Sequence, residues 1–168
     1  GQHPDPNVMY YLTVYNEPLV QPAEPEWVDV DGIVRGIHRI STGEGDGPRA
    51  QLLASGVGVP WALEAQQLLR DDWGVASDVW SVTSWTELRR DGLEVDEHNF
   101  LHPDQEPRTA YLTEKLADST GPVIAVSDYM HAVQDQIRPW VPRRFATLGA
   151  DGFGFSDTRP AARRFFKI

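Results

Sequence analysis

The chain has 168 residues, of which 40% are hydrophobic, and it includes six tryptophans, so it can bury a core and is not composed like a disordered protein. Its formal net charge of −10 repels polyanions, which argues against nucleic acid as a partner. The absence of cysteine excludes disulfides, thiolate zinc sites and thiol nucleophiles, and it fits a cytoplasmic location. No apolar run approaches the roughly 18 residues of a membrane span, so we expect no membrane partner.

The first 25 residues contain a strand pattern and then a linker pattern. Residues 8–14 are mostly β-branched or aromatic, which predicts a strand buried on both faces. Prolines at positions 18, 22 and 25 follow without apolar periodicity, as is typical of a stiff linker. We therefore expect a domain boundary near Pro25. The polar opening and the helical pattern at the last residues suggest a fragment of a longer protein.

Two strands are expected next, at residues 34–41 and 50–57. The segment between them is rich in glycine and aspartate, so the two strands are predicted to form an antiparallel hairpin. Apolar residues at helical spacing then predict a helix over residues 60–73, with Pro60 in its first turn.

Short strands and helices alternate in the second half of the chain. Strands are expected at 79–84, 123–126 and 145–148, and helices at 110–117, 129–140 and 157–166; residues 86–90 fit a short helix or turn, and residues 91–107 an irregular charged segment. This alternation predicts an α/β fold. Its form would be a three-layer open sheet, mostly parallel and covered on both faces. The hairpin would add one antiparallel edge strand.

Two glycine motifs resemble cofactor-binding sequences but are incomplete. Gly45-Asp46-Gly47 matches the start of the motif that holds magnesium in thiamine-diphosphate enzymes, which also needs an asparagine at a set distance downstream. The only asparagines are Asn7, Asn16 and Asn99, and none stands at that distance, so a turn is favoured. Gly56-Val57-Gly58 follows a strand as a dinucleotide fingerprint would, but Trp61 replaces the third glycine, which favours a plain strand-to-helix turn.

A charged segment offers candidate metal or acid–base groups. His98 and His102 would share one face of a helix and could hold zinc or iron, but Pro103 favours a loop, where this spacing loses its meaning. Four acidic side chains nearby could include an acid–base pair, although a solvated face explains them more simply: Asp91, Glu94, Asp96 and Glu97. No metal site is assigned from these patterns.

Asn16 and Glu17 are the candidate residues for a substrate pocket rim. They stand just past the carboxyl end of the first predicted strand, where open α/β sheets place ligands. The alternative is a plain loop.

Five segments together resemble one enzyme family. They are residues 10–18, 77–92, 101–103, 127–130 and 148–159, and they include Ser-Asp-Val-Trp-Ser-Val-Thr-Ser-Trp-Thr-Glu-Leu-Arg-Arg-Asp-Gly and Leu-Gly-Ala-Asp-Gly-Phe-Gly-Phe-Ser-Asp-Thr-Arg. In that order they resemble the C-terminal part of the homodimeric, bacterial-type pyruvate dehydrogenase, the decarboxylating component of the pyruvate dehydrogenase complex. The resemblance covers nearly the whole chain.

The resemblance implies a domain organisation. Members of this family resemble transketolase and have three α/β domains. Residues 1–25 would be the last strand and exit linker of the pyrimidine-binding domain, and residues 26–168 the transketolase-like C-terminal domain. Asn16 falls near the place where transketolases present a substrate-contacting residue, which favours its position in a pocket.

The resemblance also implies an activity for the full-length protein. That activity is thiamine-diphosphate-dependent and Mg²⁺-dependent oxidative decarboxylation of pyruvate, with acetyl transfer to the lipoyl group of the acyltransferase component. The family's catalytic, cofactor-binding and metal-binding motifs are missing from this chain. We therefore assign no catalytic, cofactor or metal residue to it, and expect it to be inactive alone, to bind no cofactor and to serve structure and assembly. Alternatives are a stand-alone protein-interaction module derived from this domain, and a related 2-oxo acid dehydrogenase.

Overall fold

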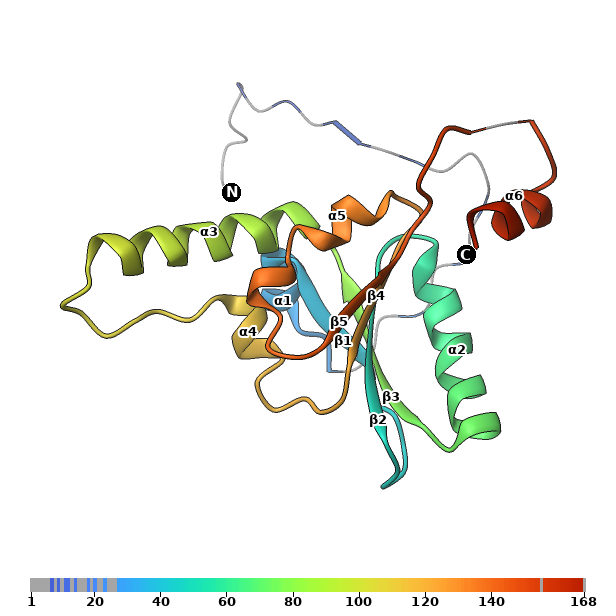
Figure 1. The fold of residues 1–168 in the computed structure, drawn as a ribbon, viewed down its shortest axis with the longest axis horizontal. Helices are drawn as coiled ribbons and strands as arrows, with labels where there is room; N and C mark the ends of the chain where they lie inside the picture. The colour runs from blue at the N-terminus through green and yellow to red at the C-terminus, as the bar shows by residue number, and fades with distance from the viewer. Residues whose placement is uncertain are drawn as a thin grey trace.

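A computed structural model shows a five-stranded sheet with helices on both faces (Figure 1). The structure describes residues 27–154 and 156–167, together with the single residues 7, 9, 11, 12, 14, 18, 20 and 23. Of the buried strand expected at residues 8–14, the structure describes residues 9, 11, 12 and 14, which are exposed and form no strand, so the prediction is wrong for them; the other three residues lie outside the described part of the chain.

The strand order is β1-β3-β2-β4-β5. β2 (Arg49–Ala54), β3 (Ala76–Val82), β4 (Val123–Val126) and β5 (Phe145–Leu148) are parallel, and β1 (Ile37–Ser41) pairs with β3 in the antiparallel sense. The α/β class and the mostly parallel sheet with one antiparallel edge strand are thus confirmed.

The predicted hairpin is wrong, because β3 lies between the two strands that were expected to pair. The segment that leaves β1 has to pass β3 before it reaches β2, and Gly43 makes this close passage possible. Its amide donates to the Asp78 carboxylate on β3 at 2.9 Å. A β-carbon at Gly43 would lie only 2.3 Å from the Ser77 carbonyl oxygen, so the chain passes over β3 at a distance that only glycine allows.

One face of the sheet is covered by α2 (Gly58–Trp73), in agreement with the predicted helix. Alternate residues of the strands point toward it, as the two-residue period of a strand requires. The buried members of this smaller core are Leu52, Ala54, Ala62 and Val79.

The opposite face carries the larger core. It is covered by α4 (Tyr111–Lys115), the 3-10 turn η1 (Arg138–Trp140) and the first turns of α3 (Trp85–Leu101), while α5 (His131–Asp135) packs beside β5. Its buried side chains include Leu53, Trp80, Trp85, Leu88, Leu112, Leu116, Val123, Ile137 and Trp140. The sheet and its two helical layers give the expected three-layer arrangement.

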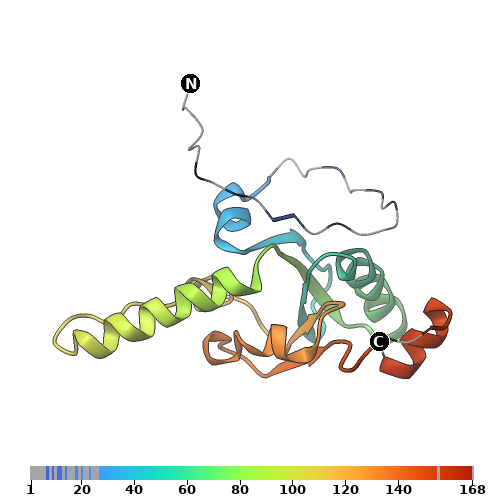
Figure 2. The same ribbon diagram turned by 90° about the horizontal axis from the view of Figure 1, so that it is seen from above.

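α3 is far longer than the short helix predicted, so the expectation of an irregular segment over residues 91–107 is wrong for residues 91–101 and holds only for 102–107. The Ser84 hydroxyl caps the helix by accepting from the Glu87 amide at 3.1 Å. Gly92 then packs against Trp140, where a β-carbon would meet the indole at 2.3 Å. Beyond this contact α3 extends away from the sheet (Figures 1 and 2), so its second half has few apolar partners.

Two further short helices, α1 (Val30–Arg35) and α6 (Arg159–Phe166), lie near the two ends of the described part of the chain. α1 stands where part of a strand was expected, and the Asp29 carboxylate caps it by accepting from the Gly32 amide at 2.9 Å. α6 is the last predicted helix, and its Arg163 guanidinium lies 4.3 Å from the ring centroid of Trp61 on α2. In the part of the chain that the structure describes, no helix is long and apolar enough to cross a membrane.

Candidate functional site

The edge where the parallel strands end, here called the carboxyl edge, is the usual ligand edge of an open α/β sheet. In this protein, polar groups at the carboxyl edge form hydrogen bonds with each other. The Trp85 indole nitrogen donates to the buried Ser55 hydroxyl at 3.0 Å. With the Gln134 amide oriented so that both of its ends are satisfied, the amide oxygen accepts from the Ser127 amide at 3.1 Å and the nitrogen donates to the Met130 carbonyl at 2.8 Å.

Gly56-Val57-Gly58 lies at this edge as the strand-to-helix turn that the sequence predicted. Gly56 has a φ of 54°, in the left-handed region, and the Gly58 amide donates to the Ser55 carbonyl at 3.0 Å. A β-carbon at Gly58 would lie 3.3 Å from the Val126 carbonyl oxygen, so this glycine lets α2 begin close to β4.

The predicted pocket-rim residues, Asn16 and Glu17, lie outside the described residues. Their role stays a prediction.

His98 and His102 lie on and just after the last turn of α3, so the predicted loop is wrong here. The helical spacing does bring the two rings together, with centroids 4.6 Å apart. The pKa of His98 is lowered by desolvation and by the nearby positive charges of Arg108 and His102. Among the residues that the structure describes, no group of three histidine, aspartate or glutamate side chains could hold a metal ion.

Two of the four candidate acid–base residues accept hydrogen bonds from neighbouring elements of the fold. The Asp91 carboxylate accepts from the Tyr111 amide at 2.7 Å, and the Asp96 carboxylate accepts from the Trp140 indole at 3.0 Å. These hydrogen bonds connect α3 to α4 and to η1. Glu94 lies in a shallow depression that Arg35 and Arg108 also line.

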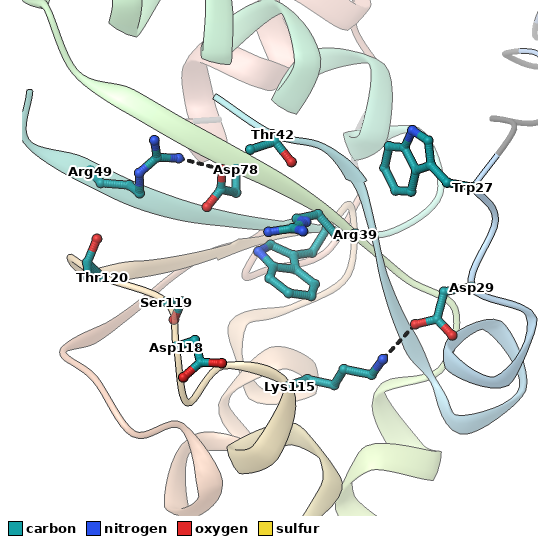
Figure 3. Close-up of a pocket in the computed structure, with 11 residues that line it drawn as sticks. Trp27, Asp29, Arg39, Thr42, Arg49, Asp78, Lys115, Asp118, Ser119 and Thr120 are labelled. Carbon is teal, nitrogen blue, oxygen red and sulfur yellow. Dashed lines mark hydrogen bonds and ion pairs between the residues drawn. The ribbon is translucent and has the colours of Figure 1, made fainter. Parts of the chain in front are cut away.

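A pocket of about 630 Å³ lies at the opposite edge, where the parallel strands begin; we call it the amino-edge pocket (Figure 3). Five separate segments contribute its walls. The lining residues are Trp27, Asp29, Arg39, Thr42, Arg49, Asp78, Trp80, Lys115, Asp118, Ser119 and Thr120.

A buried polar network forms one side of this pocket. Arg49 on β2 donates to the Asp78 carboxylate at 2.6 Å, and Asp78 is only 5% exposed. Gln51 donates to the other oxygen of Asp78 at 3.0 Å and accepts from the Trp80 indole at 2.8 Å. Charge-assisted bonds of this kind are short and directional, so the network fixes the side chains of two strands.

An ion pair forms the other side. Lys115 on α4 donates to the Asp29 carboxylate at 2.6 Å (Figure 3). This bond and the Gly32 amide lower the pKa of Asp29, and the same bond raises the pKa of Lys115. Nearby on β1, burial lowers the pKa of His38, although the negative charge of Asp29 opposes this effect. The ion pair therefore joins α1 to α4 across the pocket.

No sequence pattern predicts the amino-edge pocket. Its residues come from positions 27 to 120 and share no spacing motif, because strands adjacent in the sheet are distant in the chain. The only local signal is a charged residue at or near the beginning of a strand, as at Arg49 in β2 and Asp78 in β3. Such residues are common in strands and do not by themselves indicate a pocket.

Comparison with known proteins identifies the family. The model for the transketolase-like TK C-terminal domain matches residues 36–168. The chain belongs to the transketolase-like C-terminal domain family. The fold agrees with this membership: transketolase from Campylobacter jejuni is 24% identical with a TM-score of 0.52, over 86% of this chain and 18% of that one.

Curated relatives of this transketolase-like domain carry a more specific name. The chain is 57% identical to the "Pyruvate dehydrogenase E1 component" of Mycolicibacterium smegmatis and 56% identical to the protein of the same name from Mycobacterium tuberculosis, each over 99% of this chain. It spans only 18% of the length of either relative.

Proposed function

We propose that this chain is the C-terminal domain of a pyruvate dehydrogenase, the component that decarboxylates pyruvate and transfers the acetyl group to the lipoyl group of an acyltransferase. The observation that carries the proposal is the 57% identity over 99% of the chain to a relative with that name. Identity of this extent, with transketolase-like family membership over residues 36–168, favours the enzyme over an unrelated interaction module.

The described residues do not fit a thiamine-diphosphate site of their own. Gly45-Asp46-Gly47 lies in an exposed bend between β1 and β2, and a β-carbon at Gly45 would meet nothing within 4 Å. A diphosphate–Mg²⁺ site needs several oxygen ligands close together, and among the described residues no group of three or more histidine, aspartate or glutamate side chains could hold a metal ion. We therefore propose that thiamine diphosphate and Mg²⁺ bind elsewhere in the full-length enzyme.

The role proposed for this chain is structure and assembly. We propose that residues 1–25 belong to the preceding pyrimidine-binding domain, with Asn16 and Glu17 at its pocket rim, and that residues 26–168 form the C-terminal domain. The partners would be a second copy of the enzyme and the lipoyl acyltransferase, in the cytoplasm. The two-sided core, with Trp80 and Trp140 buried, supports a rigid scaffold.

The test is a turnover assay of the intact protein. With thiamine diphosphate and Mg²⁺, pyruvate should be decarboxylated and a lipoyl domain acetylated, whereas 2-oxoglutarate and branched-chain 2-oxo acids should react far more slowly. A preference for one of these larger acids would overturn the assignment to pyruvate, and no turnover with any 2-oxo acid would overturn the enzyme proposal.

A matched variant pair tests the scaffold role. Gly92→Ala places a β-carbon against the Trp140 ring and should lower the melting temperature and the fraction of assembled protein. Gly45→Ala adds the same methyl group where nothing lies within 4 Å, although its φ of 110° makes the bend strained locally. Both should keep the wild-type kcat per assembled enzyme. A lower kcat per assembled enzyme in either variant would contradict the structural role.

A further inference from the structure

Arg39 differs from the other basic side chains of the amino-edge pocket. Arg49 is held by Asp78 at 2.6 Å and Lys115 by Asp29 at 2.6 Å, so their charges are balanced within the protein. Within the described residues, the only interaction that the structure shows for the Arg39 side chain is with an aromatic ring. Among the described residues, the Arg39 guanidinium therefore forms an ion pair with no carboxylate of this pocket.

The Arg39 guanidinium is placed to receive a ligand. It lies over the Trp80 ring, 5.6 Å from its centroid, because Arg39 on β1 stands opposite Trp80 on β3 in the sheet register. Figure 3 shows it in the middle of the pocket, between the two balanced pairs. An arginine supported from one side by an aromatic face keeps its N–H groups free to donate at the edge of the guanidinium plane.

The surface beneath Arg39 is fixed before any ligand arrives. Trp80 is 5% exposed, and its indole nitrogen is bonded to Gln51, which is in turn bonded to Asp78. A site whose supporting groups are already ordered loses less conformational entropy on binding. The pocket volume of about 630 Å³ also falls within the range of about 300–1,000 Å³ of small-molecule sites.

We propose that the amino-edge pocket binds a small organic monocarboxylate, with the carboxylate on the Arg39 guanidinium. A guanidinium matches the two oxygens of a carboxylate with paired hydrogen bonds. Asp118 lines the same pocket, and the chain carries a net charge of −10, so a second negative charge on the ligand is disfavoured. Trp27, on the opposite side of Arg39 from Asp118 in Figure 3, is half exposed and offers an apolar surface to the ligand body.

The test is equilibrium dialysis of radiolabelled benzoate, a monocarboxylate with a flat apolar body, against the intact protein. Binding should saturate at one molecule per chain. Arg39→Gln should weaken it by about tenfold to hundredfold, the effect of losing hydrogen bonds to a charged group. Asp118→Asn should strengthen it by a few fold, because it removes a facing negative charge.

Arg89→Gln is the matched control. Arg89 is exposed on α3 and does not line the pocket, but its replacement changes the net charge by the same amount. It should leave the affinity unchanged. The melting temperature of Arg39→Gln should equal that of the wild type, which separates loss of the site from loss of the fold.

Three results would overturn the proposal. One is the absence of saturable benzoate binding, and another is equal weakening by Arg39→Gln and Arg89→Gln. The third is tighter binding of inorganic phosphate than of benzoate, which would assign the pocket to phosphate-bearing ligands. None of these results depends on whether the protein decarboxylates pyruvate.

Discussion

The two edges of the central sheet satisfy their polar groups in different ways. At the carboxyl edge, neutral hydroxyl, amide and indole groups bond to each other, as in the Trp85–Ser55 pair. At the amino edge, charged groups pair across a pocket, as in Lys115–Asp29, and Arg39 forms no ion pair with the carboxylates that the structure describes. The general rule for α/β sheets therefore names the edge where ligands are frequent, whereas the local partners of each polar group decide which side chains stay available to a ligand.

The difference between the edges is tested most strongly by removing one tryptophan from each. Trp85→Ala at the carboxyl edge should lower the free energy of unfolding by about 3–5 kcal/mol, because it leaves a cavity and deprives Ser55 of its donor. Trp27→Ala, in the wall of the amino-edge pocket, should change it by less than about 1 kcal/mol, since Trp27 is half exposed. Urea denaturation of the intact protein measures both. Equal losses would mean that the two edges do not differ in packing.

A second prediction concerns the buried network of the amino edge. Asp78→Ala removes the acceptor of Gly43, Arg49 and Gln51 together, and should cost about 2–4 kcal/mol in the free energy of unfolding. Asp71→Ala is the control, because Asp71 pairs with Arg70 on the exposed surface and should leave the denaturation midpoint unchanged. A wild-type midpoint for Asp78→Ala would show that the network does not support the pocket.

The smallest expected effect is a pH dependence that arises from His38 on β1. Burial lowers the pKa of His38, so between the folded and unfolded pKa values only the unfolded chain binds a proton. Stability should therefore rise with pH up to the ordinary histidine pKa of about 6.5 and fall as the pH drops below it. His38→Gln should flatten this slope between pH 5 and 7, measured as the denaturation midpoint at each pH.

Ile37→Val is the control for His38→Gln. It removes a methyl group from the neighbouring buried residue, so it should lower the free energy of unfolding by about 0.5–1.5 kcal/mol at every pH. The slope with pH should not change. A slope that survives in His38→Gln would assign the pH dependence to other groups.

Much of the fold was predictable where apolar residues recur in regular patterns. The parallel strands are buried runs, such as residues 123–126, and α2 has an apolar stripe toward the sheet, so both were expected near their observed positions. α3 was missed because its buried residues, Trp85, Leu88 and Gly92, all lie in its first half, and the rest of the helix buries no apolar side chain that would impose a pattern.

The pairing of β1 and the position of the pocket could not be predicted in the same way. Adjacent strands joined by a glycine-rich segment usually form a hairpin, but the close passage of Gly43 over Ser77 is a tertiary contact without a sequence signature. The unbalanced charge of Arg39 likewise follows from which acids reach Arg49 and Lys115 in three dimensions.

The position of β1 also bears on solubility. β3 has six buried residues among its seven and would, without β1, present a strand with unpaired amides to other molecules. β1 covers that border with a strand of five residues, and the positive charge of Arg39 at its centre disfavours the addition of another chain. Deleting residues 37–41 is therefore expected to cause aggregation through β3, a failure distinct from a simple loss of stability.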